Sequence, residues 1–341
     1  MDPLLLTVII IAFALTFDFL NGFHDSANSI ATVVSTRVLS PGTAVVWAAV
    51  FNFVSAFTFG TQVAGTVGKG FVNLELVTPY VMLAGIIGAI VWDLITWWFG
   101  LPTSSSHALI GGYAGAAIAR AAVLHGPSSS LSALTLSAWP PTLAFIVIAP
   151  LIGMAAAYVL MLLIYWTLRD RTRAQMHGYF TKLQLLSAAV LSFSHGTNDA
   201  QKTMGLITGV LVTAGYLKTF AVPVWVIFAA HTAIALGTLS GGWRIVHTMG
   251  RRLTPLKPYS GFCAEGGAAC SILLATHLGL PVSTTHCLVG SIAGVGAVQR
   301  FKAVRWGVAT RIVWAWVLTI PAAGATAAVV FLLIRLLNPA A

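Results

Sequence analysis

Charged residues are scarce in this chain, and their scarcity excludes a water-soluble protein. Asp, Glu, Lys and Arg make up 8% of the 341 residues, while hydrophobic residues make up 58%. Soluble domains carry roughly 25% charged residues, which they need to cover a water-facing surface. The mean hydropathy of the chain is +0.90. The composition therefore predicts an all-α polytopic membrane protein, whose helices satisfy their own backbone hydrogen bonds in lipid.

Cysteine is rare as well, which removes two further classes of protein. Cys263, Cys270 and Cys287 are odd in number and lie in or near apolar stretches. Their spacing fits neither a disulfide framework nor a zinc site, so we expect packing residues and no cofactor.

The chain also lacks a basic region ahead of its first apolar run, "MDPLLLTVIIIAFALTF". We interpret that run as a first membrane segment rather than a secretory signal.

Acidic residues are fewer than basic ones, 8 against 18, which gives a net charge of +10. The basic residues stand between apolar runs, where the positive-inside tendency of cytoplasmic loops explains them. We therefore expect the lipid bilayer as a partner and no nucleic acid.

A spanning helix needs about 20 apolar residues. The predicted membrane segments are residues 4–37, 42–66, 80–99, 103–118, 140–168, 183–213, 220–243, 262–279, 284–298 and 309–337.

Two of these segments contain a polar stretch, and the two stretches are alike. "NGFHDSANS" covers Asn21–Ser29, and "SHGTNDAQK" covers Ser194–Lys202. Asp25 and Asp199 occupy matching positions in them, 174 residues apart. We predict that each stretch interrupts its helix and frees backbone carbonyls.

A second motif is also written twice, in the same order relative to the first. "LPTSSSH" covers residues 101–107 and "LPVSTTH" covers residues 280–286. Pro281 follows Pro102 by 179 residues. Two paired motifs in one order indicate an internal duplication of about 170 residues, which is typical of two-repeat transporters.

The distribution of basic residues predicts that the two repeats are inverted. The first repeat is predicted over residues 1–168, with a re-entrant helical hairpin at 80–118. The second is predicted over 183–341, with a re-entrant hairpin at 262–298, and a cytoplasmic loop at 169–182 connects them. Basic flanks mark the cytoplasmic side, so both termini are expected outside. The residues that set this orientation are Arg169, Arg171, Arg173, Lys182, Arg244, Arg251, Arg252, Lys257, Arg300, Lys302 and Arg305.

Each predicted hairpin tip combines a proline with hydroxyl groups. Pro102 and Pro281 are expected to end one arm at the preceding residue, and a serine then caps the returning helix. A helix N-terminus carries roughly half a positive charge and free N–H groups, so two facing tips suit a tetrahedral oxyanion. His107 and His286 are expected to donate to a carbonyl of the opposite arm. The hydroxyl residues predicted to bind the anion are Ser104, Ser105, Ser106, Ser283, Thr284 and Thr285.

The polar stretches supply repeat-related carboxylates, Asp25 and Asp199. An intramembrane carboxylate costs about 2.5–3.5 kcal/mol on insertion scales and marks function. The amides of Asn21, Asn28 and Asn198 stand beside them. Together these oxygens suit a hard cation, and they suit a proton relay equally well.

Three further acids, Asp18, Asp93 and Glu265, lie in or beside apolar segments without an acidic mate in the other repeat. Pairing with a base or a carbonyl and a part in transport are both open for them. Asn52 and His231 are weaker candidates on the second helix of each repeat.

These motifs resemble those of the inorganic phosphate transporter (PiT) family. "GFHDSANSIATVVSTR", "SHGTNDAQKTMGLITG", both Leu-Pro stretches and "GGWRIVHTMG" carry the resemblance, which runs from about residue 5 to residue 335. It implies an inverted-repeat fold with two re-entrant hairpins, often a homodimer, that imports inorganic phosphate together with a cation. By position, the family's site corresponds to Asp25, Asn28, Asn198, Asp199 and the hydroxyls of 104–106 and 283–285.

Two positions depart from the sodium-coupled members of that family, which repeat Gly-x-Asn-Asp-x-x-Asn in both halves. His24 stands for an Asn in the first copy, and Lys202 for the last Asn in the second. This version resembles the bacterial low-affinity branch, which is coupled to protons and carries phosphate or a neutral metal–phosphate complex. The ammonium of Lys202 would occupy the place of a bound cation beside Asp199. Histidine titrates near neutrality, which makes His24 a candidate proton carrier.

The sequence thus predicts a phosphate symporter of the bacterial inner membrane rather than an enzyme. H⁺ is the expected coupling ion, and a divalent metal carried with phosphate is a further option. Sodium coupling, and sulfate as the cargo of the same fold, stay open. An intramembrane serine hydrolase is disfavoured, because the Ser/His pattern occurs twice and no Gly-x-Ser-x-Gly element is present. Asn198 and Lys202 join the hydroxyls in the phosphate site, and the residues assigned to the coupling ion are Asp25, Asp199, Asn21, Asn28 and His24.

Overall fold

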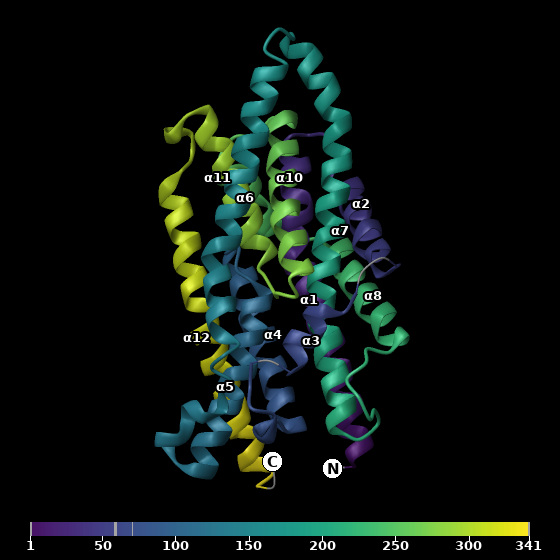
Figure 1. Ribbon diagram of the computed structural model, residues 1–341, viewed down its shortest axis with the longest axis vertical. Helices are drawn as coiled ribbons and strands as arrows, with labels where there is room; N and C mark the ends of the chain where they lie inside the picture. Colours follow the sequence, from purple (N-terminus) through teal and green to yellow (C-terminus); the bar gives the residue numbers. More distant parts are fainter. Residues whose placement is uncertain (1, 58–59, 70, 340–341) are drawn as a thin grey trace.

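The structure is a computed structural model that describes residues 2–57, 60–69 and 71–339, and helices dominate it (Figure 1). The α-helices are α1 (Pro3–Ser35), α2 (Pro41–Val54), α3 (Gln62–Lys69), α4 (Pro79–Phe99), α5 (Ser105–His125), α6 (Trp139–Thr167), α7 (Arg173–Thr213), α8 (Val224–Ser240), α9 (Trp243–His247), α10 (Pro258–His277), α11 (Thr284–Gln299) and α12 (Trp306–Leu337). The other helical segments are η1 (Ser55–Phe57), η2 (Leu74–Leu76), η3 (Pro127–Ala133), η4 (Thr248–Arg252) and η5 (Phe301–Ala303).

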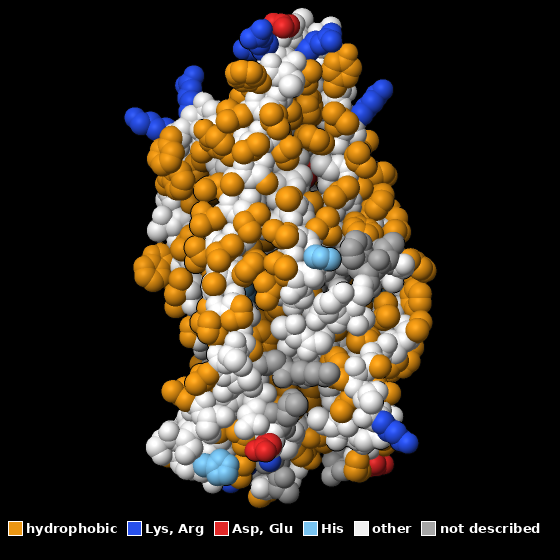
Figure 2. Space-filling view, viewed as in Figure 1, with side chains coloured by type: hydrophobic (Ala, Val, Ile, Leu, Met, Phe, Trp, Pro, Cys, Tyr) orange, Lys and Arg blue, Asp and Glu red, His pale blue; other side chains and the backbone are white. Residues whose placement is uncertain are grey.

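The surface of the molecule fits a lipid environment. Within the described residues, five helices are long and apolar enough to cross a membrane, and up to seven spans result if each bent helix pair is one span. Figure 2 shows large apolar side chains over the middle of the molecule, while Lys and Arg gather mainly at one end. The predicted all-α polytopic membrane protein is confirmed.

Several helices begin with a capping residue followed by proline, which fixes where the chain enters the helix. The pairs are Asp2–Pro3, Ser40–Pro41 and Thr78–Pro79, and each capping side chain accepts a backbone N–H of the first turn. Proline is tolerated at the first helical position because its missing N–H would have no partner there.

The two polar stretches do not interrupt their helices, so that prediction is wrong. α1 is continuous through residues 21–29 and α7 through residues 194–202. Neither stretch contains proline, and a single glycine costs a helix only about 1 kcal/mol. Neighbouring helices bind several of the polar side chains, such as those of Asn28 and Asn198, without any unwinding of the backbone. Side-chain oxygens, rather than freed carbonyls, are what these stretches offer.

Two predicted boundaries also differ from the structure. The chain turns between α6 and α7 over residues 168–172, so most of the predicted loop 169–182 is helical. Thr172 caps α7 and exchanges hydrogen bonds with Gln175 in a capping box. The predicted segment 42–66 is not one helix, because α2 ends at Val54, η1 follows, and α3 begins at Gln62. Residues 58–59 of that segment lie outside the described residues.

Two helical hairpins approach each other from opposite ends of the molecule. In Figure 1 the α4–α5 hairpin rises from the end that holds both termini, and the α10–α11 hairpin descends from the other end. Their arms end at Phe99 and His277, several residues before the prolines predicted to end them. Gly100 (φ 64°) and Gly279 (φ 70°) reverse the chain in the left-handed region, which glycine adopts without a steric penalty.

The two halves of the chain are interleaved. α6 packs against α10 and α11, while α12 packs against α4 and α5. Each half therefore covers the hairpin of the other half with a long helix.

Two glycines set how closely the polar-stretch helices approach their neighbours. A Cβ at Gly22 of α1 would collide with the backbone carbonyl of Ile234 on α8. A Cβ at Gly196 of α7 would collide with the backbone carbonyl of Asn52 on α2. The matching glycines of the two polar stretches thus have matching packing roles.

Two separate apolar cores enclose a polar layer at mid-height. Along α1, the buried residues of one core end at Phe17, and those of the other begin at Ala27. Along α7, one core ends at Leu191 and the other resumes at Ala200. The polar stretches occupy these gaps, so the fold brings both of them to one level.

Candidate functional site

The two hairpin turns present two helix N-termini in the polar layer. The hydroxyl of Ser104 accepts a hydrogen bond from the N–H of His107 at 3.2 Å, and that of Ser283 from the N–H of His286 at 3.1 Å. These N-caps of α5 and α11 confirm the prediction made from the Leu-Pro stretches. Each cap leaves other first-turn N–H groups and the positive end of the helix dipole for an anion.

A buried lysine joins the two turns. The ammonium of Lys202 on α7 donates to the hydroxyl of Ser106 at the turn of the α4–α5 hairpin. It also donates to the carbonyl of Val282 at the turn of the α10–α11 hairpin, at 3.0 Å. It also forms an ion pair with Asp199, three residues earlier on the same helix. Ser106 donates to the Val282 carbonyl at 3.2 Å, so the turns touch directly. Lys202 is 1% exposed, so its charge is buried within the protein.

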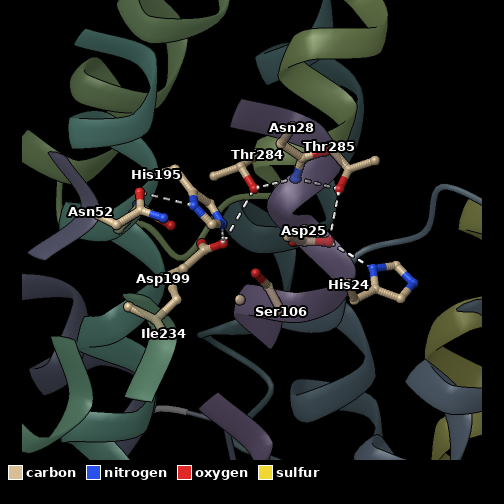
Figure 3. Close-up of polar contacts among 12 residues, drawn as sticks. His24, Asp25, Asn28, Asn52, Ser106, His195, Asp199, Ile234, Thr284 and Thr285 are labelled. Carbon is tan, nitrogen blue, oxygen red and sulfur yellow. Dashed lines mark hydrogen bonds and ion pairs between the residues drawn. The ribbon is translucent and has the colours of Figure 1, made fainter. Parts of the chain in front are cut away.

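Asn28 ties the second turn to both polar-stretch helices. Its Nδ2 donates to the hydroxyl of Thr284 at 3.0 Å and to that of Thr285 at 2.9 Å. Thr284 in turn donates to Asp199 Oδ2 at 3.3 Å, and Thr285 donates to Asp25 Oδ1 at 3.5 Å. Figure 3 shows these contacts converging between α1, α7 and the first turn of α11.

The repeat-related carboxylates form a compact group with a histidine. Ligand atoms of Asp25, His195 and Asp199 lie within 4.8 Å of one another, and all three residues are buried (Figure 3). His195 Nε2 lies 3.0 Å from Asp199 Oδ2, and its Nδ1 lies 3.3 Å from Asn52 Oδ1. Two carboxylates and one imidazole are a suitable donor set for a divalent cation. With the imidazole protonated, the same group forms ion pairs without a metal.

His24 links this group to the first hairpin. Its Nδ1 lies 2.7 Å from Asp25 Oδ1, and its Nε2 lies 3.1 Å from the hydroxyl of Thr96 on α4 and 3.5 Å from that of Thr103. The ring therefore bridges a carboxylate and two hydroxyls, which is a geometry suited to moving a proton.

The structure joins most of the predicted site residues in one network. Asn198 turns instead toward the second hairpin, where its Nδ2 donates to Thr276 Oγ1 at 2.8 Å and to the Leu280 carbonyl at 3.3 Å. It positions that turn. The side chains of Asn21 and Ser105 are buried outside the network. The residues joined are His24, Asp25, Asn28, Ser106, Asp199, Lys202, Thr284 and Thr285.

The two histidines after the caps contact each other rather than a carbonyl of the opposite arm. The rings of His107 and His286 pack edge to face with centroids 4.9 Å apart, and His286 stacks on Trp316 of α12 at 3.7 Å. The predicted carbonyl bond is not among their hydrogen bonds in the described part of the chain. Neither ring nitrogen of His286 bonds to a hydroxyl within those residues, so Ser283 and His286 do not form a nucleophile–base pair there.

Sequence reasoning missed His195 and gave Asn52 little weight. His195 precedes Asp199 by four residues, so a helix through this stretch places both side chains on one face. The four-residue spacing predicts the pairing of His195 with Asp199 only if the stretch is a continuous helix. Asn52 joins through Nδ2 to Thr238 on α8 at 2.9 Å, besides its contact with His195.

Glu265 lies outside this network, toward the basic end. Its carboxylate accepts hydrogen bonds from Thr32 at 2.6 Å, from Gln184 at 2.8 Å, and from Ser187. These neutral donors from α1 and α7 hold the first arm of the second hairpin in place.

Comparison with known proteins agrees with this architecture. A protein of Rhizobium meliloti (strain 1021), named "Probable low-affinity inorganic phosphate transporter", is 51% identical over 327 residues, 96% of this chain and 96% of that protein. A protein of Bacillus subtilis (strain 168) with the same name is 43% identical over 343 residues, 98% of each chain. The fold is similar to a solved structure titled "The sodium-dependent phosphate transporter", with a TM-score of 0.85 and 25% identity over 97% of this chain and 99% of that chain.

The family predicted from the duplicated motifs is confirmed by a family profile. The profile described as the phosphate transporter family matches residues 21–179 and 168–327. These two stretches include both polar stretches and both hairpin turns. The chain therefore belongs to the phosphate transporter family.

Proposed function

We propose that this phosphate transporter imports inorganic phosphate in symport with protons. The observation that carries the proposal is the ammonium of Lys202, which is buried, paired with Asp199 and bonded to both hairpin turns. The sodium-coupled members of the family that this chain resembles have an asparagine at the position of Lys202. A fixed cation at this point attracts phosphate and takes the place of a transported one.

The charges of the site explain why phosphate needs a companion. Asp25 and Asp199 bring two negative charges, and Lys202 brings one positive charge. A phosphate dianion would add to the excess of negative charge, and unpaired charge in an enclosed site is costly. Protons taken up by His24, His195 or the two carboxylates offset that charge without needing a set of metal ligands.

The anion would lie between the two turns, on the N–H groups that open α5 and α11. The hydroxyls of Ser106, Thr284 and Thr285 are the side-chain donors there. Thr284 and Thr285 donate to Asp199 and Asp25 in the structure. Each hydroxyl that turns to phosphate leaves a carboxylate free to take up a proton, which links anion binding to proton binding. One hairpin unit would then rock against the rest of the molecule to release both.

A metal–phosphate complex is a second form of the cargo that the donor set supports. Asp25, His195 and Asp199 would hold the divalent ion, because their ligand atoms already lie within 4.8 Å of one another. The phosphate would still be held by the turns. In that form the metal itself offsets the charge of the anion.

Sodium coupling is the alternative, and the similarity in fold to a protein titled sodium-dependent favours it. Two features of this chain argue for protons instead. α1 and α7 are unbroken, so they offer no freed carbonyls to complete the ligand shell of a hard cation. Lys202 already supplies a positive charge to Asp199.

We place the basic end of the molecule in the cytoplasm of a bacterium, following the positive-inside rule. The α6–α7 turn, with Arg169 and Arg171, lies at that end, and both termini lie at the other (Figure 1). The protein would then be a multi-pass inner-membrane protein with both termini outside. Assembly as a homodimer follows from the resemblance to the PiT family.

Uptake of labelled phosphate by proteoliposomes tests the proposal when sodium, proton and magnesium gradients are varied independently. We expect uptake without sodium, driven by an inward proton gradient and lost when a protonophore dissipates it. Empty liposomes are the control. Strict dependence on sodium would contradict proton coupling, and full competition by sulfate would contradict phosphate as the specific cargo.

A further inference from the structure

A cavity of about 650 Å³ lies at the basic end, where four helices begin or end. The C-terminal ends of α1 and α6 and the N-terminal ends of α7 and α10 surround it. Its volume is within the range of roughly 300–1,000 Å³ typical of small-molecule sites. It lies apart from the network of Asp25 and Asp199, and the transport proposal does not use it.

The lining of this cavity is strongly cationic. The lining side chains include five that carry a permanent positive charge: Arg37, Arg169, Arg171, Arg173 and Lys257. The one acid in the turn is Asp170, whose Oδ2 lies 3.8 Å from Nε of Arg169; both side chains are exposed, so the ion pair is weak. The positive-inside rule explains basic residues at this end but does not explain why these five surround one cavity.

Apolar and aromatic residues also line the cavity. Ile164 and Pro258 are the buried ones, and the ring centroids of Tyr165 and Tyr259 lie 6.2 Å apart in a tilted arrangement. Ser35 and Thr36 also line the cavity, with their hydroxyl protons donated within the protein to Thr32 and Gln184. A ligand that suits these walls carries several negative charges at one end and a flat or apolar body at the other.

The backbone at Arg37 also marks the place. Its φ is 64°, and it is the one non-glycine residue with positive φ among the described residues. A left-handed conformation costs such a residue roughly 1–3 kcal/mol and persists where surrounding structure holds it, often at ligand sites. Arg37 follows the end of α1 and itself lines the cavity.

We propose that this cavity binds a nucleoside polyphosphate of the cytoplasm, with ATP as the representative ligand. The guanidinium groups of Arg169, Arg171 and Arg173 present forked donors to phosphate oxygens. Tyr165 and Tyr259 pack against the base. The site is separate from the phosphate site between the hairpin turns.

Occupancy of the cavity would slow transport, a consequence that rests on the proposed function. The ligand would bridge α1 and α7, which carry Asp25 and Asp199, to α10, the first arm of the second hairpin. A hydrogen-bonded chain already runs inward from the cavity: Thr36 donates to Gln184 at 2.9 Å, and Gln184 donates to Glu265 on α10 at 2.8 Å. A ligand that binds one arrangement of these helices holds the protein in it.

Calorimetric titration of the full-length protein with ATP tests the site. The protein is placed in nanodiscs of zwitterionic lipid at one fixed ionic strength, because such contacts are screened by salt. We expect the triple variant Arg169→Gln, Arg171→Gln, Arg173→Gln to bind about tenfold more weakly. The matched control, Arg300→Gln, Lys302→Gln, Arg305→Gln, removes the same charge from the α11–α12 connection, outside the cavity. It should bind within about twofold of the wild type.

The outcomes separate the possible occupants. Binding of ATP that is tighter than that of AMP and of tripolyphosphate supports the proposal. Equal binding of tripolyphosphate, equal loss in both triple variants, or no binding by the wild type overturns it. Displacement of ATP in nanodiscs of anionic lipid also overturns it, because the cavity would then hold a lipid headgroup. Failure of the proposed function is recognised separately, since wild-type vesicles would then take up no phosphate while the titration still decides the fate of the cavity.

Discussion

A single buried ammonium, that of Lys202, is central to the proposed site. Lys202 and Asp199 lie on one face of α7, and the lysine reaches both hairpin turns from there. Removing one partner of a buried ion pair costs about 3–5 kcal/mol, because the other charge is left uncompensated. In the proposed site, the residue therefore has both a structural and an electrostatic part.

Lys202→Asn is expected to reduce proton-driven phosphate uptake at least tenfold. Asp199 loses its ammonium partner, and the two turns lose their shared donor. Initial rates in proteoliposomes measure the effect. Lys218→Asn is the matched control, because Lys218 is exposed in the connection after α7. Stimulation of the Lys202→Asn variant by sodium would support the interpretation that the ammonium replaces a bound cation, whereas uptake at the wild-type rate would refute it.

Asp25→Asn and Asp199→Asn are each expected to abolish net uptake. Asparagine keeps the volume of the side chain and one acceptor oxygen but cannot exchange a proton at working pH. Asp170→Asn serves as control, because Asp170 is exposed in the turn between α6 and α7. Binding of labelled phosphate to the purified variants separates lost coupling from lost binding. Normal accumulation by both variants would remove these carboxylates from the transport cycle.

At the scale of elements, close helix crossings at glycine hold the two polar stretches at one level of the molecule. Gly22 and Gly196 lie against the backbones of α8 and α2, where a Cβ has no room. Close crossings of small residues are a common way for membrane helices to pack. They fix the spacing of α1 to α8 and of α7 to α2, the helices that flank the group of ligand atoms from Asp25, His195 and Asp199.

Gly22→Ala is expected to lower the free energy of unfolding by roughly 1–3 kcal/mol, as overpacking of a tight contact does. Thermal unfolding in detergent, followed by fluorescence, measures it. Gly42→Ala is the matched control: Gly42 is also helical, but nothing lies within 4 Å of a Cβ built there. Equal unfolding temperatures of the two variants would mean that α1 and α8 separate without cost.

The sequence predicted features that depend on neighbours along the chain. The caps at Ser104 and Ser283 follow from local chemistry, and the duplication follows from spacing. It did not predict the continuity of α1 and α7, because the partners that their polar side chains do find come from other helices. Contacts such as Asn28 with Thr284 join residues 256 positions apart, and no local pattern contains them. The role of His195 was hidden by the same error, since its alignment with Asp199 requires an unbroken helix.

At the scale of the whole molecule, the two apolar cores act as separate blocks with the site between them. One core is built mainly around α4, α5 and α12, and the other around α6, α10 and α11. α1 and α7 pass through both. A transporter that alternates between two sides must open a path through one block while the other stays closed, and a polar layer between two blocks is a natural plane for such a motion.

The distribution of charge between the two ends gives the last prediction, which concerns orientation. With Cys270→Ala as background, since Cys270 is the exposed cysteine, single cysteines are placed at Ser128 in η3 and at Ala174 in α7. Both positions are exposed and lie at opposite ends of the molecule (Figure 1). A membrane-impermeant maleimide should label Ser128→Cys in intact cells, and Ala174→Cys only after the cells are permeabilised. The reason is that moving the arginines around Ala174 across the bilayer is far costlier than retaining them in the cytoplasm. The reverse pattern would place both termini inside, and the cavity at the basic end would then face away from cytoplasmic nucleotides.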